Sequence, residues 1–107
     1  MPMITIQFDD TKVSNDEAEA LSEGIQAIVA TVTGIEDVFV YANSAQIKIK
    51  VAPIEIFVQM TAAKITDLDE LTNEIKVGLK EWKEKQNFAH PINLTVIPMM
   101  WKVEIGV

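Results

Sequence analysis

The sequence of 107 residues contains no cysteine and no arginine, and its single histidine is His90. Without cysteine the chain cannot form a disulfide, a thiolate nucleophile or a zinc–thiolate site, and one histidine cannot build a multi-histidine metal site. Without arginine it lacks the side chain that best grips a carboxylate or phosphate through two parallel hydrogen bonds. The four glycines are too scattered to form a phosphate-binding loop. We therefore expect no metal site. His90 is followed by Pro91, and we expect this pair to lie in a turn.

Positive charge is also scarce, because sixteen acidic residues face nine lysines and leave a net charge of −7. A chain this acidic repels phosphate backbones, so neither nucleic acid nor an anionic membrane surface is an expected partner. The carboxylates, Asp9 and Asp10 among them, are expected on the solvated surface. No apolar run approaches the length of a membrane span and no signal-peptide pattern precedes the first strand, so we expect a cytoplasmic protein.

Two capping patterns mark the starts of two helices. Ser14 followed by Glu17 forms a capping box, and apolar residues then recur at helical spacing until Gly34. A second apolar stripe of the same spacing follows in the other half of the chain. Two pairs are candidates to cap it: Asp67 with Glu70, or Thr66 with Asp69.

Alternation of apolar and polar residues predicts the strands. It covers residues 3–8, 38–42, 47–51, 54–60, 92–96 and 101–105, and Pro98 is expected to break the pattern between the last two. One strand, one helix and two strands thus occur twice, about 50 residues apart. We interpret the chain as a single domain, 1–107, with pseudo-repeats 2–51 and 52–107. The predicted fold class is α/β of the α+β type: two tandem β-α-β-β units forming one sheet, with both helices on one face.

The sheet face away from the helices is predicted to be mixed in character. It carries Met3 and Phe57 beside Thr5 and Gln59. Such a face is too apolar to stay fully in water and too polar for a dry core. We expect it to be buried against other copies of the chain in a homo-oligomer.

Pro2 is the first candidate for chemistry. Initiator methionine is commonly removed before proline, which would leave a secondary amine at the start of a core strand. Such an amine titrates near pH ~8, and desolvation lowers its pKa toward that of a base usable at neutral pH. The alternative is a proline that merely precedes a strand, where its missing N–H costs nothing.

Several short motifs resemble the tautomerase superfamily, in the tandem-repeat branch that includes macrophage migration inhibitory factor and carboxymethyl-hydroxymuconate isomerase. They are the opening Pro2-Met3, the helix ending Thr33-Gly34, the second strand start at Pro53, and Lys64-Ile65. The resemblance implies a homotrimer with inward-facing sheets and active sites at subunit boundaries. It also implies that Pro2 is a catalytic base for tautomerisation or isomerisation of small keto or enol substrates, without metal or organic cofactor.

The residues expected to bind such a substrate are Lys48, Lys64, Asn93, Thr95 and Trp101. Asn93 and Thr95 occupy the strand where migration inhibitory factor has a tyrosine and an asparagine. The relatives that act on dianionic acids carry arginines around the proline, and this chain has none, which favours monoanionic or neutral substrates. The lysines also fit solvated strand edges, and Trp101 also fits a subunit contact.

Three functions are compatible with this sequence. The first is a tautomerase or isomerase that uses Pro2. The second is a non-catalytic oligomeric module on the same scaffold that binds a small molecule or a protein. The third is an unrelated ferredoxin-like domain that dimerises through its sheet, since fold alone does not settle function.

Overall fold

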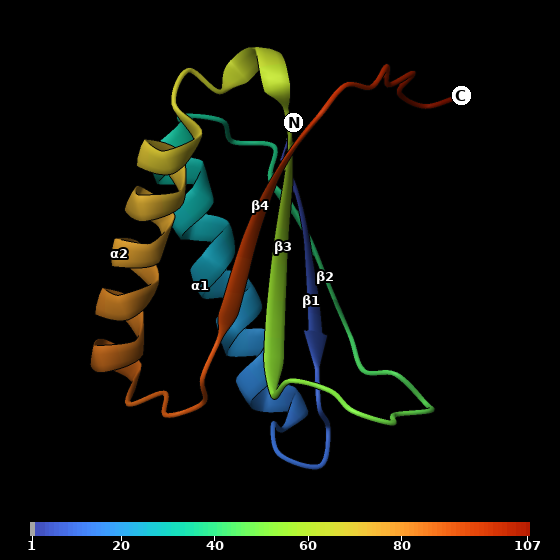
Figure 1. The fold of residues 1–107 in the computed structure, drawn as a ribbon, viewed down its shortest axis with the longest axis vertical. Coiled ribbons are helices and arrows are strands. Elements are labelled where there is room, and N and C mark those ends of the chain that lie inside the picture. The colour runs from blue at the N-terminus through green and yellow to red at the C-terminus, as the bar shows by residue number, and fades with distance from the viewer. Residues whose placement is uncertain (1) are drawn as a thin grey trace.

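A computed structural model describes residues 2–107 in two layers, with two helices covering one face of a sheet (Figure 1). The elements in chain order are β1 (Met3–Phe8), α1 (Asn15–Thr33), β2 (Phe39–Asn43), β3 (Ile54–Thr61), the 3-10 helix η1 (Ala62–Lys64), α2 (Leu68–Gln86) and β4 (Asn93–Met99). Neither α-helix of the described chain is long and apolar enough to cross a membrane. The predicted fold class, one sheet with both helices on the same side, is confirmed.

The sheet has the strand order β2-β1-β3-β4. β1 pairs in parallel with β2, β3 pairs in parallel with β4, and the central pair β1/β3 is antiparallel, with Ile6 opposite Ile56. Each parallel pair is joined by a helix, as a β-α-β crossover requires. Alternate residues of the two central strands point toward the helices and are fully buried: Ile4, Ile6, Ile54, Ile56 and Val58.

Both helices begin where capping residues satisfy free backbone N–H groups. The Ser14 hydroxyl accepts a hydrogen bond from the N–H of Glu17, and the Glu17 carboxylate accepts one from the N–H of Ser14, so the predicted capping box is confirmed. Asp67 caps α2 by accepting from the N–H of Glu70, which decides between the two predicted caps. Gly34 ends α1 in the left-handed region, at φ 71°.

Glu17 also holds the loop that follows α2. Its Oε2 lies 2.7 Å from Nε2 of His90, so one carboxylate joins the start of α1 to a segment 73 residues away. The hydrogen bond from the Ser14 N–H, reinforced by the bond to His90, lowers the pKa of Glu17. The expectation that His90 lies in a turn missed this long-range contact.

The lowered pKa of Glu17 predicts a loss of stability in acid. A carboxyl group whose pKa is lower in the folded state stabilises the fold above its unfolded pKa, and this contribution disappears as pH falls through the folded value. We expect Glu17→Gln to flatten the decline in unfolding free energy between about pH 5 and pH 3, as measured by urea denaturation. Glu23→Gln, at an exposed site on the same helix, is the control. Identical pH dependence in both variants would contradict the assignment.

The two helices contact each other through a reciprocal pair of glycines. A Cβ on Gly24 of α1 would lie 2.6 Å from Cε2 of Trp82, and a Cβ on Gly78 of α2 would lie 2.8 Å from Cγ2 of Ile28. Each glycine therefore accommodates the side chain four residues after the other glycine. This reciprocity is what two tandem repeats would produce, although the division into repeats stays a prediction.

The expected strands at residues 47–51 and 101–105 are wrong. Both segments leave the body of the molecule without pairing, the first between β2 and β3 and the second after β4 (Figure 1). Ile49 is 98% exposed and Ile105 is 86% exposed. Alternation marks a segment able to form a strand, but a strand also needs a partner, and a single copy of the chain supplies none here.

The expected break at Pro98 is also wrong, because β4 continues through Pro98 to Met99. Proline has no N–H to donate to a ladder, so in a central strand, which has a neighbour on each side, it would cost a hydrogen bond. β4 is an edge strand, paired only with β3, so the missing N–H on its open side costs no ladder bond.

Candidate functional site

Pro2 is a fully buried residue at one end of the sheet. It precedes β1, a central strand, and its carbonyl oxygen accepts a hydrogen bond of 3.3 Å from the N–H of Phe39, the first residue of β2. Met3 pairs with Gln59, so one step further along the ladder Pro2 lies opposite Met60, which is 3% exposed. Pro2 is thus buried where β1 and β2 begin and β3 ends.

Met60 also lines a cavity of about 200 Å³, and Pro2 is not among the residues that line it. The end of α1, the η1 turn and the first turns of α2 enclose it, and Thr33, Met60 and Lys64 are among its lining residues. Three carboxylates of α2 also line it: Asp67, Glu70 and Glu74. The family resemblance singled out Lys64, but nothing in the sequence pattern placed these three carboxylates beside it.

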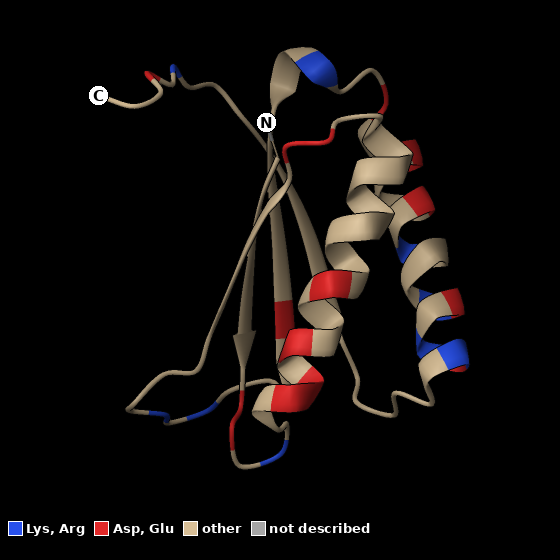
Figure 2. Cartoon of the chain, turned by 180° about the vertical axis from the view of Figure 1, so that it is seen from behind, with Lys and Arg blue, Asp and Glu red and all other residues tan. Residues whose placement is uncertain are grey.

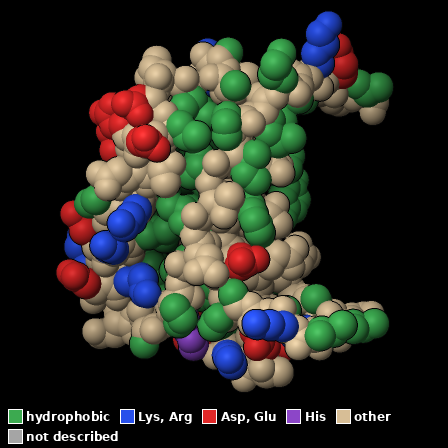
Figure 3. All heavy atoms as spheres, in the orientation of Figure 1, with side chains coloured by type: hydrophobic (Ala, Val, Ile, Leu, Met, Phe, Trp, Pro, Cys, Tyr) green, Lys and Arg blue, Asp and Glu red, His purple; other side chains and the backbone are tan. Residues whose placement is uncertain are grey.

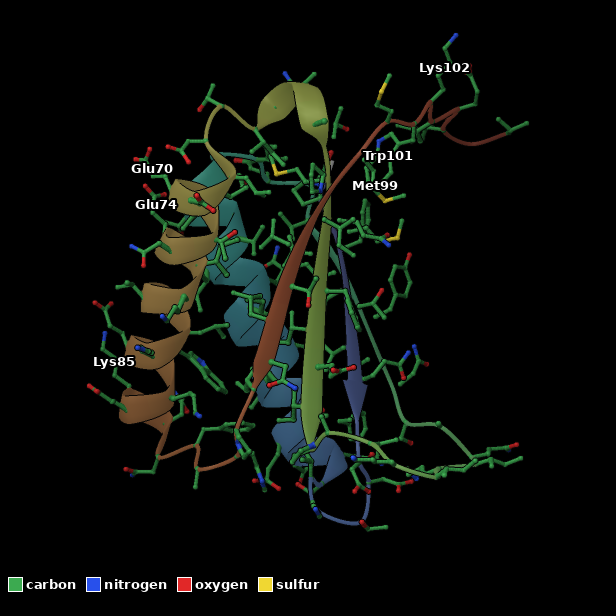
Figure 4. All side chains as sticks on the ribbon, in the orientation of Figure 1. Glu70, Glu74, Lys85, Met99, Trp101 and Lys102 are labelled. Atoms are coloured by element: carbon green, nitrogen blue, oxygen red, sulfur yellow. The ribbon has the colours of Figure 1, made fainter. Side chains whose placement is uncertain are left out.

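Trp101 lies at this same end of the molecule. It follows β4, whose last residue, Met99, pairs with Thr61, and its side chain is half-buried. Figure 4 shows Trp101 and Met99 on the opposite side of the sheet from Glu70 and Glu74, which project from α2. Pro2, Lys64 and Trp101 thus share one end of the sheet.

The other three candidates lie elsewhere in the chain. Asn93 pairs with Glu55 near the start of β3, and Thr95 pairs with Phe57 half-way along the open face. β3 has eight residues, so its two ends are separated by roughly 20–25 Å at 3.3 Å per residue. One small ligand therefore cannot touch both Pro2 and Asn93 of the same copy.

Lys48 belongs to the same distant end as Asn93. Its Nζ lies 2.7 Å from Oδ1 of Asp10, and this hydrogen bond from Lys48 lowers the pKa of the Asp10 carboxyl. Lys48 also lines a cavity of about 300 Å³ with Gln7 and Glu55. Within one copy, Lys48 attaches the segment before β3 to the sheet and is remote from Pro2.

Asp9 differs from the expectation of a solvated carboxylate, because it is 7% exposed. Its Oδ1 accepts hydrogen bonds from the N–H and the hydroxyl of Thr11, and the hydroxyl bond is the main cause of its lowered pKa. The Asp9 N–H donates to the carbonyl of Pro53. Asp9 therefore closes the turn after β1.

Within residues 2–107 the structure contains no cluster of three or more side chains that could bind a metal ion.

Comparison with solved structures finds several chains that share this fold. Neither a protein-family model nor a curated protein sequence matches the chain. A malonate semialdehyde decarboxylase inhibited by 3-bromopropiolate superposes with a TM-score of 0.71 at 15% identity, over 98% of this chain and 91% of that one. A 5-carboxymethyl-2-hydroxymuconate delta-isomerase gives 0.68 at 13% identity, over 99% and 89%.

A third solved structure is a macrophage migration inhibitory factor-like protein. The macrophage migration inhibitory factor-like protein of Entamoeba histolytica superposes with a TM-score of 0.61 at 14% identity, over 96% of this chain and 93% of that one. The three matches span nearly the whole chain. They confirm the expected resemblance at the level of the fold. This chain has the tautomerase fold, shared with macrophage migration inhibitory factor and carboxymethyl-hydroxymuconate isomerase.

Proposed function

We propose that the chain is a tautomerase or isomerase in which Pro2, freed by removal of Met1, acts as general base on small keto or enol substrates. The observation that carries the proposal is the complete burial of the Pro2 ring at the start of a central strand of the tautomerase fold. Burial disfavours the charged form of an amine, so a freed Pro2 would be held as a neutral base. Its carbonyl bond to Phe39 would keep the nitrogen in a fixed position.

The cavity beside Met60 supports a substrate of low charge. Its one lysine, Lys64, is outnumbered by the carboxylates of Asp67, Glu70 and Glu74. A dianionic substrate would be repelled there, whereas a monoanion can place its carboxylate near Lys64. Trp101 lies at the same end but on the other side of the sheet, so we assign it to a subunit contact and not to this cavity.

The proposal is tested on the processed wild-type protein. Intact-mass measurement should first show that the chain begins at Pro2, because Met1 would convert the amine into an amide. The processed protein should then convert the enol form of phenylpyruvate, a monoanionic aromatic enol, into its keto form. Absence of activity in correctly processed protein would contradict the enzyme and favour the non-catalytic module on the same scaffold.

We further propose that the chain forms a homo-oligomer, with a trimer as the expected state. The two unpaired segments support it, because they project from the body and alternate exposed apolar residues with polar ones (Figure 2). Within a single copy Asn93 is too far along the sheet to meet Pro2, and Thr95 lies half-way along the open face; a neighbouring copy would bring them to Pro2. The open sheet face, with half-buried Met3 and Phe57, supports the same association.

Ile49→Asp should dissociate the oligomer. Ile49 is 98% exposed in one copy, so the substitution leaves the core of that copy intact. If a neighbour buries it, the change removes about 2 kcal/mol of apolar burial and places a charge in the contact. Sedimentation should therefore show a trimer for the wild type and a monomer for the variant, with Lys50→Ala as the control. A monomeric or dimeric wild type would contradict the proposed assembly.

A further inference from the structure

Three lysines form a row along α2 beside the edge strand β4. Lys76, Lys80 and Lys83 are spaced i, i+4 and i+7, so they share one side of the helix. All three line a groove of about 430 Å³ between α2 and the start of β4. Figure 3 shows lysine side chains on α2 bordering a hollow with hydrophobic side chains inside it. A chain with a net charge of −7 thus concentrates three of its nine lysines at one groove.

These lysines have no negative partner in the groove. Like charges at i, i+4 cost a few tenths of a kcal/mol on a helix. Within residues 2–107 no ion pair involves Lys76, Lys80 or Lys83, and no carboxylate is among the lining residues of the groove. Glu84 lines the adjoining hollow instead. A carboxylate bound among the three lysines would relieve their mutual repulsion.

The floor of the groove is apolar. Leu79 of α2 contributes to it, and so do Ile92 and Leu94 at the start of β4. Ile92 and Leu94 remain half-exposed because β4 is the last strand of the sheet and no further element covers its outer side. A volume of this size lies within the range of small-molecule sites. The groove therefore offers hydrocarbon contact directly below a positive rim.

We propose that this groove binds a small apolar monocarboxylic acid, with its carboxylate among Lys76, Lys80 and Lys83 and its hydrocarbon body against Leu79 and Leu94. A neutral molecule would leave the lysines unpaired. A dicarboxylate would place a second charge on the apolar floor, at a desolvation cost. Within one copy the groove lies at the opposite end of the strands from Pro2, and the proposal rests on the lysine row and the apolar floor, not on catalysis by Pro2.

Titration with octanoate tests the proposal on the full chain. Amide chemical shifts should change along residues 72–83 and 92–94, and calorimetry should give saturable binding. The triple variant K76Q/K80Q/K83Q should bind octanoate about tenfold more weakly or worse, because each neutralised lysine removes one charge interaction. Lys85→Gln is the matched control, since Lys85 faces the hollow between α1 and α2. 1-Octanol, which lacks the charge, should bind weakly to the wild type and to the triple variant.

Four results would overturn the proposal. The wild type could fail to bind octanoate, as it would if a second copy of the chain covered the groove. The triple variant, checked for folding by circular dichroism, could bind as tightly as the wild type. Octanol could bind as tightly as octanoate, which would leave the lysines without a role. Lastly, the shift changes could map to the Pro2 end instead, where Pro2→Ala would then alter binding.

Discussion

If Pro2 is the general base, Pro2→Ala should lower the rate of enol-to-keto conversion of phenylpyruvate by about 100-fold or more and leave the fold intact. Removal of a positioned general base typically costs 10²–10⁴-fold in rate. Alanine keeps the backbone carbonyl that bonds to the N–H of Phe39, so β1 remains in register with β2. It replaces the secondary amine by a primary one and removes the buried ring that fixes the nitrogen. The measurement is kcat/KM for proteins whose amino terminus has been verified by mass.

Pro53→Ala is the matched control for this variant. Pro53 precedes β3 as Pro2 precedes β1, but its nitrogen is always part of a peptide bond. Its carbonyl bond from the N–H of Asp9 is kept in the alanine variant. Pro53→Ala should therefore retain wild-type kcat/KM, whereas an equal loss in both variants would assign the effect to strand packing. Unchanged activity in the Pro2→Ala variant would contradict the proposal that Pro2 is the general base.

Gly24→Ala destabilises the fold by about 1–3 kcal/mol, although alanine is the better helix former. In an open helix the same change would stabilise by about 1 kcal/mol. Here the added methyl group would enter the Trp82 indole, 2.6 Å from Cε2 and 2.9 Å from Cδ1. The indole cannot move freely, because its other neighbour is Phe88, with ring centroids 5.1 Å apart. Urea denaturation of both proteins measures the difference.

A double-mutant cycle separates the steric effect from helix propensity. In a Trp82→Ala background the methyl group of Gly24→Ala meets no ring, so the substitution should become neutral or stabilising. Gly78→Ala should cost less than Gly24→Ala in the wild type, since it meets only Cγ2 of Ile28 within 3.0 Å. A penalty for Gly24→Ala that persists in the Trp82→Ala background would show that the helix contact is not its cause.

Local signals in the sequence were sufficient for the helices. The Ser14–Glu17 box and Gly34 act within a turn of the chain, so the ends of α1 follow from neighbouring residues alone. Asp67 and Thr66 offered two caps for α2, and the backbone geometry selected Asp67. The row of Lys76, Lys80 and Lys83 is equally local, and its spacing is readable from the sequence. The groove beside this row exists only because the fold places the start of β4 next to α2.

Non-local pairing decided where the local signals were ambiguous. Residues 47–51 alternate as well as residues 3–8 do, yet only the latter form a strand within one copy. Pro98 has the signature of a strand break but lies on an edge, where its missing N–H is tolerated. Nothing in the sequence stated which strands are edges or which lack a partner.

The sequence by itself determined the two helices and the apolar faces that build the core, and it singled out Pro2 as the residue that could become a free amine at the start of a strand. Only the tertiary structure decided that Lys64 and Trp101 join Pro2 at one end of the sheet while Lys48 and Asn93 lie at the other. Helix caps and alternating faces depend on neighbours a few residues away. A site, an edge or a glycine contact depends on residues that only folding brings together.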